Sequence, residues 1–117
     1  MPGVNFGGWL PLVDARASAP ESPGVLQARG DALVAYPRGR SAMLLYAASR
    51  ADETLRGYVG GRGAPAIDRA REAGARYVRF GGAAAPEHER DRLLAQFTAR
   101  FGASPVVNAS LGGAGDV

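Results

Sequence analysis

The sequence predicts a single α+β domain in which helices pack against a sheet. The chain of 117 residues has room for one hydrophobic core, and 46% of its residues are hydrophobic, as in a globular protein. Segments with strand patterns and segments with helix patterns follow one another along it. No apolar run approaches the roughly 20 residues that a membrane span needs. We expect three strands, two helices, a strand and a helix, in that order.

The N-terminal part of the chain predicts an arm followed by three strands. Residues 1–23 are rich in proline, glycine and serine, which favours an irregular arm whose Trp9 packs on the domain as a cap. Three strands are expected over 24–29, 32–36 and 42–47. Gly30 and Asp31 are typical of a turn between the first two strands. The third run is continuously apolar, as in a buried central strand.

Local signals place two helices next. Ser49 and Asp52 have a spacing close to that of a capping box, which favours a short helix through Val59. Pro65 should begin a second helix, because proline fits the first turn. Gly74 should end that helix.

The C-terminal part contains the clearest helix. Alternation over 75–80 predicts a half-buried strand. The segment 86–101 starts with proline, has acidic residues in its first turn and is followed by Gly102, so it predicts a helix. Residues 104–108 should be extended, and the tail over 109–117 is expected to be disordered.

The composition excludes several kinds of chemistry. The chain has no cysteine and one histidine, which rules out disulfides, thiol catalysis and multi-histidine metal sites. No basic region precedes an apolar stretch at the N-terminus, so we expect no signal peptide. The absence of cysteine fits a cytoplasmic protein, and without a long apolar run we expect no membrane partner. All 14 basic residues are arginine, and the net charge of +3 is mild for a nucleic-acid binder.

The positive charge is concentrated in the middle of the sequence. Between 56 and 79, six arginines face two acidic residues, which gives +4, whereas the rest of the chain carries −1. This favours either a nucleic-acid surface or an ordinary pair of solvated helices.

Three segments share their order and spacing with one known family. They cover residues 23–26, 36–49 and 89–108. Arg56 follows the second segment and lies ten residues after Tyr46. Together they resemble the GIY-YIG nuclease superfamily, which includes homing endonucleases and the incision subunit of bacterial nucleotide-excision repair. The resemblance implies a small antiparallel β-sheet flanked by helices. It divides the chain into an N-terminal arm over 1–23, a GIY-YIG-like domain over 24–108 and a tail over 109–117.

The resemblance implies roles for individual residues. In that family, tyrosines, a helical arginine and a metal-binding carboxylate surround one phosphodiester. Tyr46 matches the second-triplet tyrosine, Arg56 the arginine and Asn108 the closing asparagine. Leu26 stands in place of the first-triplet tyrosine, and Tyr36 could replace that hydroxyl in space. From spacing alone, Tyr46 is also typical of a core tyrosine and Arg56 of a solvated helix residue.

The metal ligand that the resemblance implies has two candidates. One alignment makes Glu89 the ligand of Mg²⁺ or Mn²⁺, and another puts Gln96 near that place. The two residues are seven apart and share one helical stripe. A glutamine would hold a divalent cation poorly.

These residues lead to three functional hypotheses. The first is a divergent nuclease-fold domain with impaired or lost cleavage, which binds DNA or RNA without a cofactor. Its binding residues would be Tyr46, Arg56, Arg62, Arg69 and Asn108.

The second hypothesis is an active endonuclease that depends on Mg²⁺ or Mn²⁺. Glu89 would hold the metal, Arg56 would stabilise the transition state, and Tyr36 or Tyr46 would place the attacking water. The third is a non-catalytic protein-interaction module that uses Trp9 and the arm.

Overall fold

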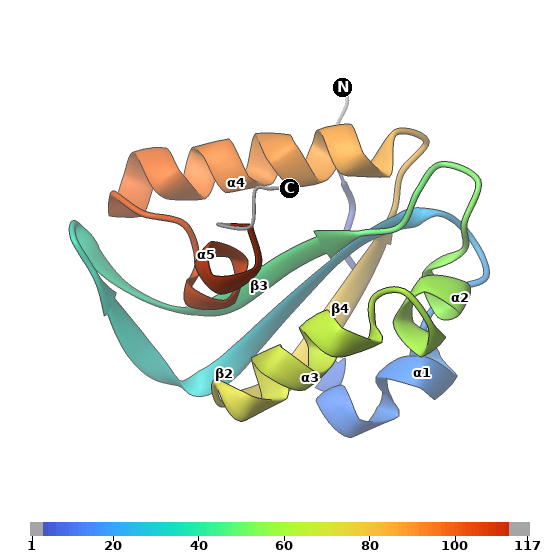
Figure 1. Cartoon of the computed structure of the whole chain (residues 1–117), viewed down its shortest axis with the longest axis horizontal. Coiled ribbons are helices and arrows are strands. Elements are labelled where there is room, and N and C mark those ends of the chain that lie inside the picture. The colour runs from blue at the N-terminus through green and yellow to red at the C-terminus, as the bar shows by residue number, and fades with distance from the viewer. Residues whose placement is uncertain (1–3, 113–117) are drawn as a thin grey trace.

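The computed structural model describes residues 4–112, which form a four-stranded antiparallel sheet with helices on both faces (Figure 1). This is an α+β fold with a small antiparallel sheet, as the sequence predicts. Its elements are β1 (Leu10–Pro11), the 3-10 turn η1 (Leu12–Asp14), α1 (Ala15–Ser18), β2 (Gly24–Tyr36), β3 (Gly39–Ala48), α2 (Leu55–Gly60), α3 (Ala64–Glu72), β4 (Ala75–Gly82), α4 (Pro86–Phe101) and α5 (Val106–Gly112).

The pairing register decides which side chains share a face of the sheet. The strand order is β1-β4-β2-β3, and Gln27 of β2 lies opposite Tyr46 of β3 and Arg79 of β4. Opposite residues of an antiparallel pair project from the same face, so these three side chains lie together. Leu26, one position earlier, projects from the other face.

The first two expected strands are one strand. The ranges 24–29 and 32–36 both belong to β2, and the expected turn at Gly30 is an irregularity within it. A Cβ on Gly30 would lie 2.6 Å from the carbonyl oxygen of Gly74, so glycine here permits a close approach of two chain segments. The hairpin turn lies at 37–38 instead.

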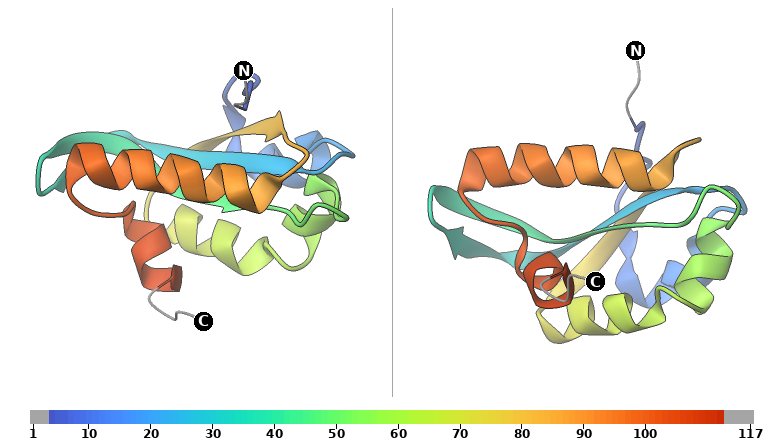
Figure 2. Two further views of the ribbon diagram at one scale, coloured as in Figure 1. Left: turned by 90° about the horizontal axis from the view of Figure 1, so that it is seen from above. Right: turned by 45° about the horizontal axis from the view of Figure 1, so that its top comes forward.

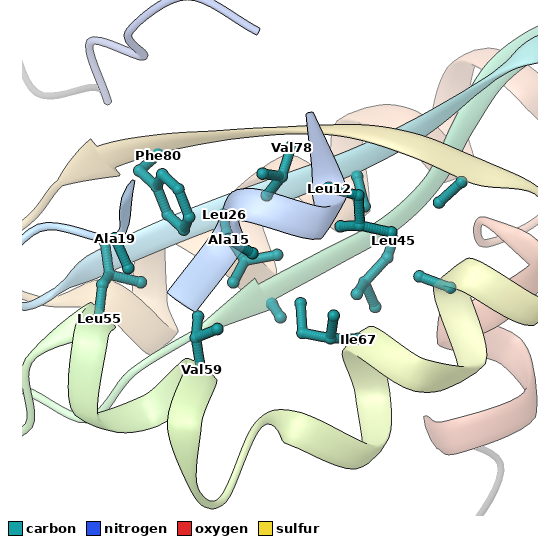
Figure 3. Packing of buried hydrophobic residues seen from close by; sticks show 14 of the residues in the cluster. Leu12, Ala15, Ala19, Leu26, Leu45, Leu55, Val59, Ile67, Val78 and Phe80 are labelled. Carbon is teal, nitrogen blue, oxygen red and sulfur yellow. The ribbon is translucent and has the colours of Figure 1, made fainter. Parts of the chain in front are cut away.

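The helices form a layer on each face of the sheet. Helix α4 lies across the upper face in Figure 1, over β3 and β2, and α2 and α3 lie below (Figures 1 and 2). The main core lies between the sheet and these lower helices (Figure 3). Leu12, Ala15 and Ala19 are buried in that core, so this part of the expected arm belongs to the folded domain.

Capping explains where α4 and α2 begin and end. Helix α4 has the predicted bounds, with Pro86 in its first turn and Gly102 after it at a φ of 86°. Helix α2 begins after Thr54, whose hydroxyl accepts a hydrogen bond from the Gly57 N–H at 3.0 Å. Ser49, the expected cap, is buried, and its hydroxyl accepts a bond from the β2 backbone instead.

The C-terminal segment is helical rather than extended. Helix α5 includes the last residues of the stretch expected to be extended, 104–108, and packs beside β3 and α3. The expected disordered tail over 109–117 begins inside this helix. Residues 113–117 lie outside the described part of the chain.

Candidate functional site

Tyr46 lies on the upper face of β3 beneath α4. Its ring centroid is 6.0 Å from that of Phe97, and the residue is 8% exposed. Within residues 4–112 its hydroxyl makes no hydrogen bond. Burial raises the pKa of Tyr46, and the positive charge of Arg79 opposes that rise. The phenol is therefore protonated at neutral pH and can donate a hydrogen bond.

Tyr36 packs against the same phenylalanine of α4. Its ring meets that of Phe97 edge-on at 5.1 Å. Its hydroxyl donates to the Met43 carbonyl at 3.0 Å and accepts from the Val106 N–H at 3.2 Å. Burial raises the pKa of Tyr36. The structure thus brings the two tyrosines to one cluster, but both hydrogen-bonding functions of the Tyr36 hydroxyl serve the fold.

Asn108 of α5 holds the outer edge of the sheet. Its Oδ1 accepts from the Tyr46 N–H at 2.8 Å, and its Nδ2 donates to the Tyr46 carbonyl at 2.8 Å. Because β3 is an edge strand, the amide satisfies groups that a further strand would otherwise bind. Asn108 therefore contacts the backbone of Tyr46 and supports its position.

Leu26 lies in the lower core and faces away from Tyr46. The residue is fully buried, and its neighbour Gln27 is the one opposite Tyr46. A tyrosine at position 26 in this backbone would project into the lower core. The residue placed to face Tyr46 is a glutamine.

Arg56 is directed toward the connection between α1 and β2. Its Nε donates to the Ala19 carbonyl at 3.0 Å and its Nη2 to the Ala17 carbonyl at 3.3 Å. Its Nη1 forms an ion pair with Glu21 at 2.8 Å. The guanidinium therefore ties the N-terminal segment to α2.

The charge of Arg62 is also neutralised by an acidic residue of the chain. It pairs with Glu53 at 2.7 Å and lies 4.9 Å from the ring centroid of Tyr58. The hydrogen bond from Arg62 lowers the pKa of Glu53. Arg69 is exposed on α3 and makes no side-chain hydrogen bond or ion pair within the described residues.

The residues that would hold a divalent metal do not form a metal-binding cluster. Oε1 of Glu89 accepts hydrogen bonds from Nε and Nη2 of Arg92, at 3.0 and 2.8 Å. Gln96 is exposed and neutral. Between residues 4 and 112, no three carboxylate or imidazole side chains gather. A Mg²⁺ or Mn²⁺ ion would find one carboxylate that already pairs with a guanidinium and no cluster of further acidic ligands in this part of the chain, so this donor set does not fit it.

A second group of side chains occupies the upper face of β2 and β4. The guanidinium carbon of Arg79 lies 4.8 Å from the ring centroid of Phe6 and 4.5 Å from that of Trp9. The guanidinium carbon of Arg29 lies 4.8 Å from the centroid of Trp9 and 5.3 Å from that of Tyr77. Rings and cations therefore alternate, and we call these five side chains the arginine–aromatic ladder.

The N-terminal segment brings two of the rings to the ladder. Figure 2 shows this segment beside β4, away from α4. The Gly7 N–H donates to the Phe80 carbonyl of β4 at 2.9 Å. A Cβ on Gly81 would lie 2.2 Å from a methyl group of Val4, so a glycine is needed there for the segment to lie against the strand.

The ladder carries positive charge without an ion-pair partner. Neither Arg29 nor Arg79 forms an ion pair in the described chain. Nε of Arg79 donates to Oε1 of Gln27 at 2.6 Å, and Nε of Arg29 is buried with no hydrogen-bond partner in the part of the chain that the structure describes. Desolvation lowers the pKa of Arg79. Asp31 raises the pKa of Tyr77 and is the acidic group at that end of the ladder. An anion could accept hydrogen bonds from these guanidiniums and neutralise their charge.

The sequence alone does not single out Gln27, Arg29 or Arg79 as site residues. Trp9, expected as a cap over the core, lies on the guanidiniums instead. The available signal was the alternation that places Gln27 and Arg29 on one face of β2 and Tyr77 and Arg79 on one face of β4. Only the register shows that these residues meet, and it depends on residues about fifty positions apart.

The upper face thus combines an unbonded tyrosine hydroxyl with two cations held between rings. No helix within the described residues is both long and apolar enough to cross a membrane. No protein-family model, curated protein or solved structure matches the chain, so a function has to be assigned from the chemistry of this surface.

Proposed function

We propose that this chain is a cytoplasmic, divergent GIY-YIG nuclease-fold domain that binds DNA or RNA and has impaired or lost cleavage. The observation that carries the proposal is the pair of guanidiniums, Arg29 and Arg79, that have aromatic contacts but no ion pair among residues 4–112. Tyr46 lies on the same face, across Gln27 from Arg79, and adds a hydrogen-bond donor.

Stacked arginines are suited to phosphate recognition. A guanidinium uses its face for an aromatic ring and its edge for two parallel hydrogen bonds to a phosphate. The rings restrict the side-chain rotation that free arginines would lose on binding. Gln27 fixes Nε of Arg79 and leaves its Nη groups available to a ligand.

Several contacts argue against efficient cleavage. A base that activates water must accept a proton, and the raised pKa of Tyr46 keeps its phenolate scarce at neutral pH. The Tyr36 hydroxyl, the Arg56 guanidinium and the Glu89 carboxylate each have partners within the fold. Only a cleaving enzyme would need Mg²⁺ or Mn²⁺ at Glu89.

A salt-titrated binding assay tests the proposal. The full chain is compared with Arg79→Gln and with Arg62→Gln, a control arginine that also stacks on a ring but is paired with Glu53. We expect the affinity for nucleic acid to fall as the salt concentration rises. Arg79→Gln should lower the affinity about tenfold and should reduce the slope of log affinity against log salt by the amount due to about one phosphate contact. Arg62→Gln should change affinity less than about twofold. Binding that is absent or independent of salt contradicts the proposal.

A plasmid-nicking assay with Mg²⁺ and Mn²⁺ tests the loss of cleavage. We expect no nicking by the wild type, Glu89→Gln or Arg56→Ala. Metal-dependent nicking that is lost in both variants would identify an active endonuclease. Nicking that persists in Glu89→Gln would indicate a contaminant. If the chain neither binds nor cleaves nucleic acid, the interaction module remains, and Trp9→Ala should then lose its partner.

A further inference from the structure

We propose that the arginine–aromatic ladder takes a single strand of nucleic acid, with unpaired bases stacked against its rings and phosphates bound to Arg29 and Arg79. This inference rests on the proposed nucleic-acid function and names the form of ligand. It assigns a binding role to Phe6, Trp9 and Tyr77.

The rings of the ladder are accessible from solution. Phe6, Trp9 and Tyr77 are each partly exposed, although all three contact a cation. Phe6 and Tyr77 stand at the ends and contact one guanidinium each, whereas Trp9 contacts two. The end rings can therefore accept a further planar group.

The bases of a single strand have accessible planar faces that can stack on these rings, whereas the bases within a duplex do not. Bases of a single strand can stack on protein rings or on guanidinium planes, and an antiparallel sheet face is a known platform for this. In a duplex each base face is covered by the next base pair, so only groove edges and phosphates remain. The rings of the ladder would contribute nothing to duplex binding beyond holding the arginines.

The charge of the ladder also favours a single strand. Proteins that bind duplexes through phosphates commonly neutralise about 6–10 of them. The ladder offers two guanidiniums without an ion pair among the described residues, in a chain whose net charge is +3, and Asp31 lies at one end. Two phosphate contacts give weak binding, so stacking has to provide much of the affinity.

Trp9 is the chain's single tryptophan, so its fluorescence reports on the ladder alone. The full chain is titrated with dT and U oligonucleotides of about 12 nucleotides and with a duplex of the same length. We expect single strands to bind at least about tenfold more tightly than the duplex and to quench Trp9 through stacking. Quenching by the single strand and not by the duplex supports the inference.

Variants at one end ring separate stacking from charge. Tyr77→Leu should weaken single-strand binding roughly tenfold with an unchanged salt dependence, and Tyr77→Phe should restore most of that loss. Arg79→Gln should instead flatten the salt dependence. Circular dichroism confirms that each variant is folded.

The outcomes distinguish this inference from the proposed function. Equal affinity for duplex and single strand, or an unchanged affinity in folded Tyr77→Leu, overturns single-strand stacking and leaves nucleic-acid binding standing. If neither nucleic acid binds to the wild type, both proposals fail.

Discussion

The arginines around α2 and the arginines on the upper face of β2 and β4 differ in what surrounds them. Arg56 and Arg62 each donate to a carboxylate, and Arg56 also binds two backbone carbonyls. Arg29 and Arg79 contact rings and have no ion pair among residues 4–112. The first pair stabilises the fold, and the second pair can bind a ligand's negative charge.

This difference shows why charge counted along a sequence is a poor guide to a binding surface. The segment 56–79 carries +4, but Glu21 and Glu53, which neutralise Arg56 and Arg62, lie outside it. Arg29 also lies outside it and has no ion pair within the described residues. Charge available for a ligand depends on which acidic groups fold back onto each arginine.

The largest expected effect concerns Asn108, whose side-chain contacts serve the fold. Asn108→Ala should lower the free energy of unfolding by about 2 kcal/mol, because it leaves the N–H and carbonyl of Tyr46 without partners. Chemical denaturation measures this loss. Asn108→Asp keeps an acceptor but removes the Nδ2 donor, so it should recover part of the stability. A loss below about 0.5 kcal/mol for Asn108→Ala would show that water replaces the amide.

A carboxylate placed next to Arg79 should neutralise its charge, as Glu53 neutralises that of Arg62. Gln27→Glu places a carboxylate where the amide oxygen lies 2.6 Å from Nε of Arg79. We expect about tenfold weaker nucleic-acid binding at pH 7, or about 1.4 kcal/mol, because the new charge neutralises the guanidinium. Gln27→Met removes the hydrogen bond without adding charge and should lose less. Equal losses in the two variants would show that the bond to Arg79, rather than its charge, controls binding.

Local signals predicted part of the elements, and long-range pairing decided the site. The bounds of α4 were predictable because Pro86 and Gly102 act within a turn of the helix ends. The turn expected at Gly30 was wrong, since glycine there allows close packing of chain segments. The contacts of Arg56 depend on residues 17–21 folding back to α2, which no local pattern indicates.

Removing Arg56 should affect stability and leave the ladder intact. Arg56→Ala removes bonds to Ala17, Ala19 and Glu21 and should cost about 1 kcal/mol of unfolding free energy, since the side chain is 48% exposed. Arg69→Ala is the matched control, because Arg69 is an exposed helical arginine without side-chain bonds in the described residues, and it should be nearly neutral. Nucleic-acid affinity should change less than about twofold in both variants. A tenfold loss of affinity in Arg56→Ala would indicate that nucleic acid binds at α2 and not at the ladder.

Removing the partner of Arg62 should have the smallest effect. Glu53→Gln should cost less than about 1 kcal/mol of stability at neutral pH, because the ion pair is partly exposed. Arg62 lowers the pKa of Glu53 in the folded state, so the wild-type contribution is present above the ordinary pKa of glutamate and is lost as the pH falls through the lowered value. Denaturation midpoints of wild type and variant should therefore converge on acidification. The freed Arg62, still against Tyr58, should raise nucleic-acid affinity less than about threefold, because it lies apart from the ladder. If the affinity gained in Glu53→Gln were as large as the affinity lost in Arg79→Gln, any unpaired, ring-stacked arginine of this chain would bind nucleic acid equally well. The position of the ladder on the upper face of the sheet would then not determine binding.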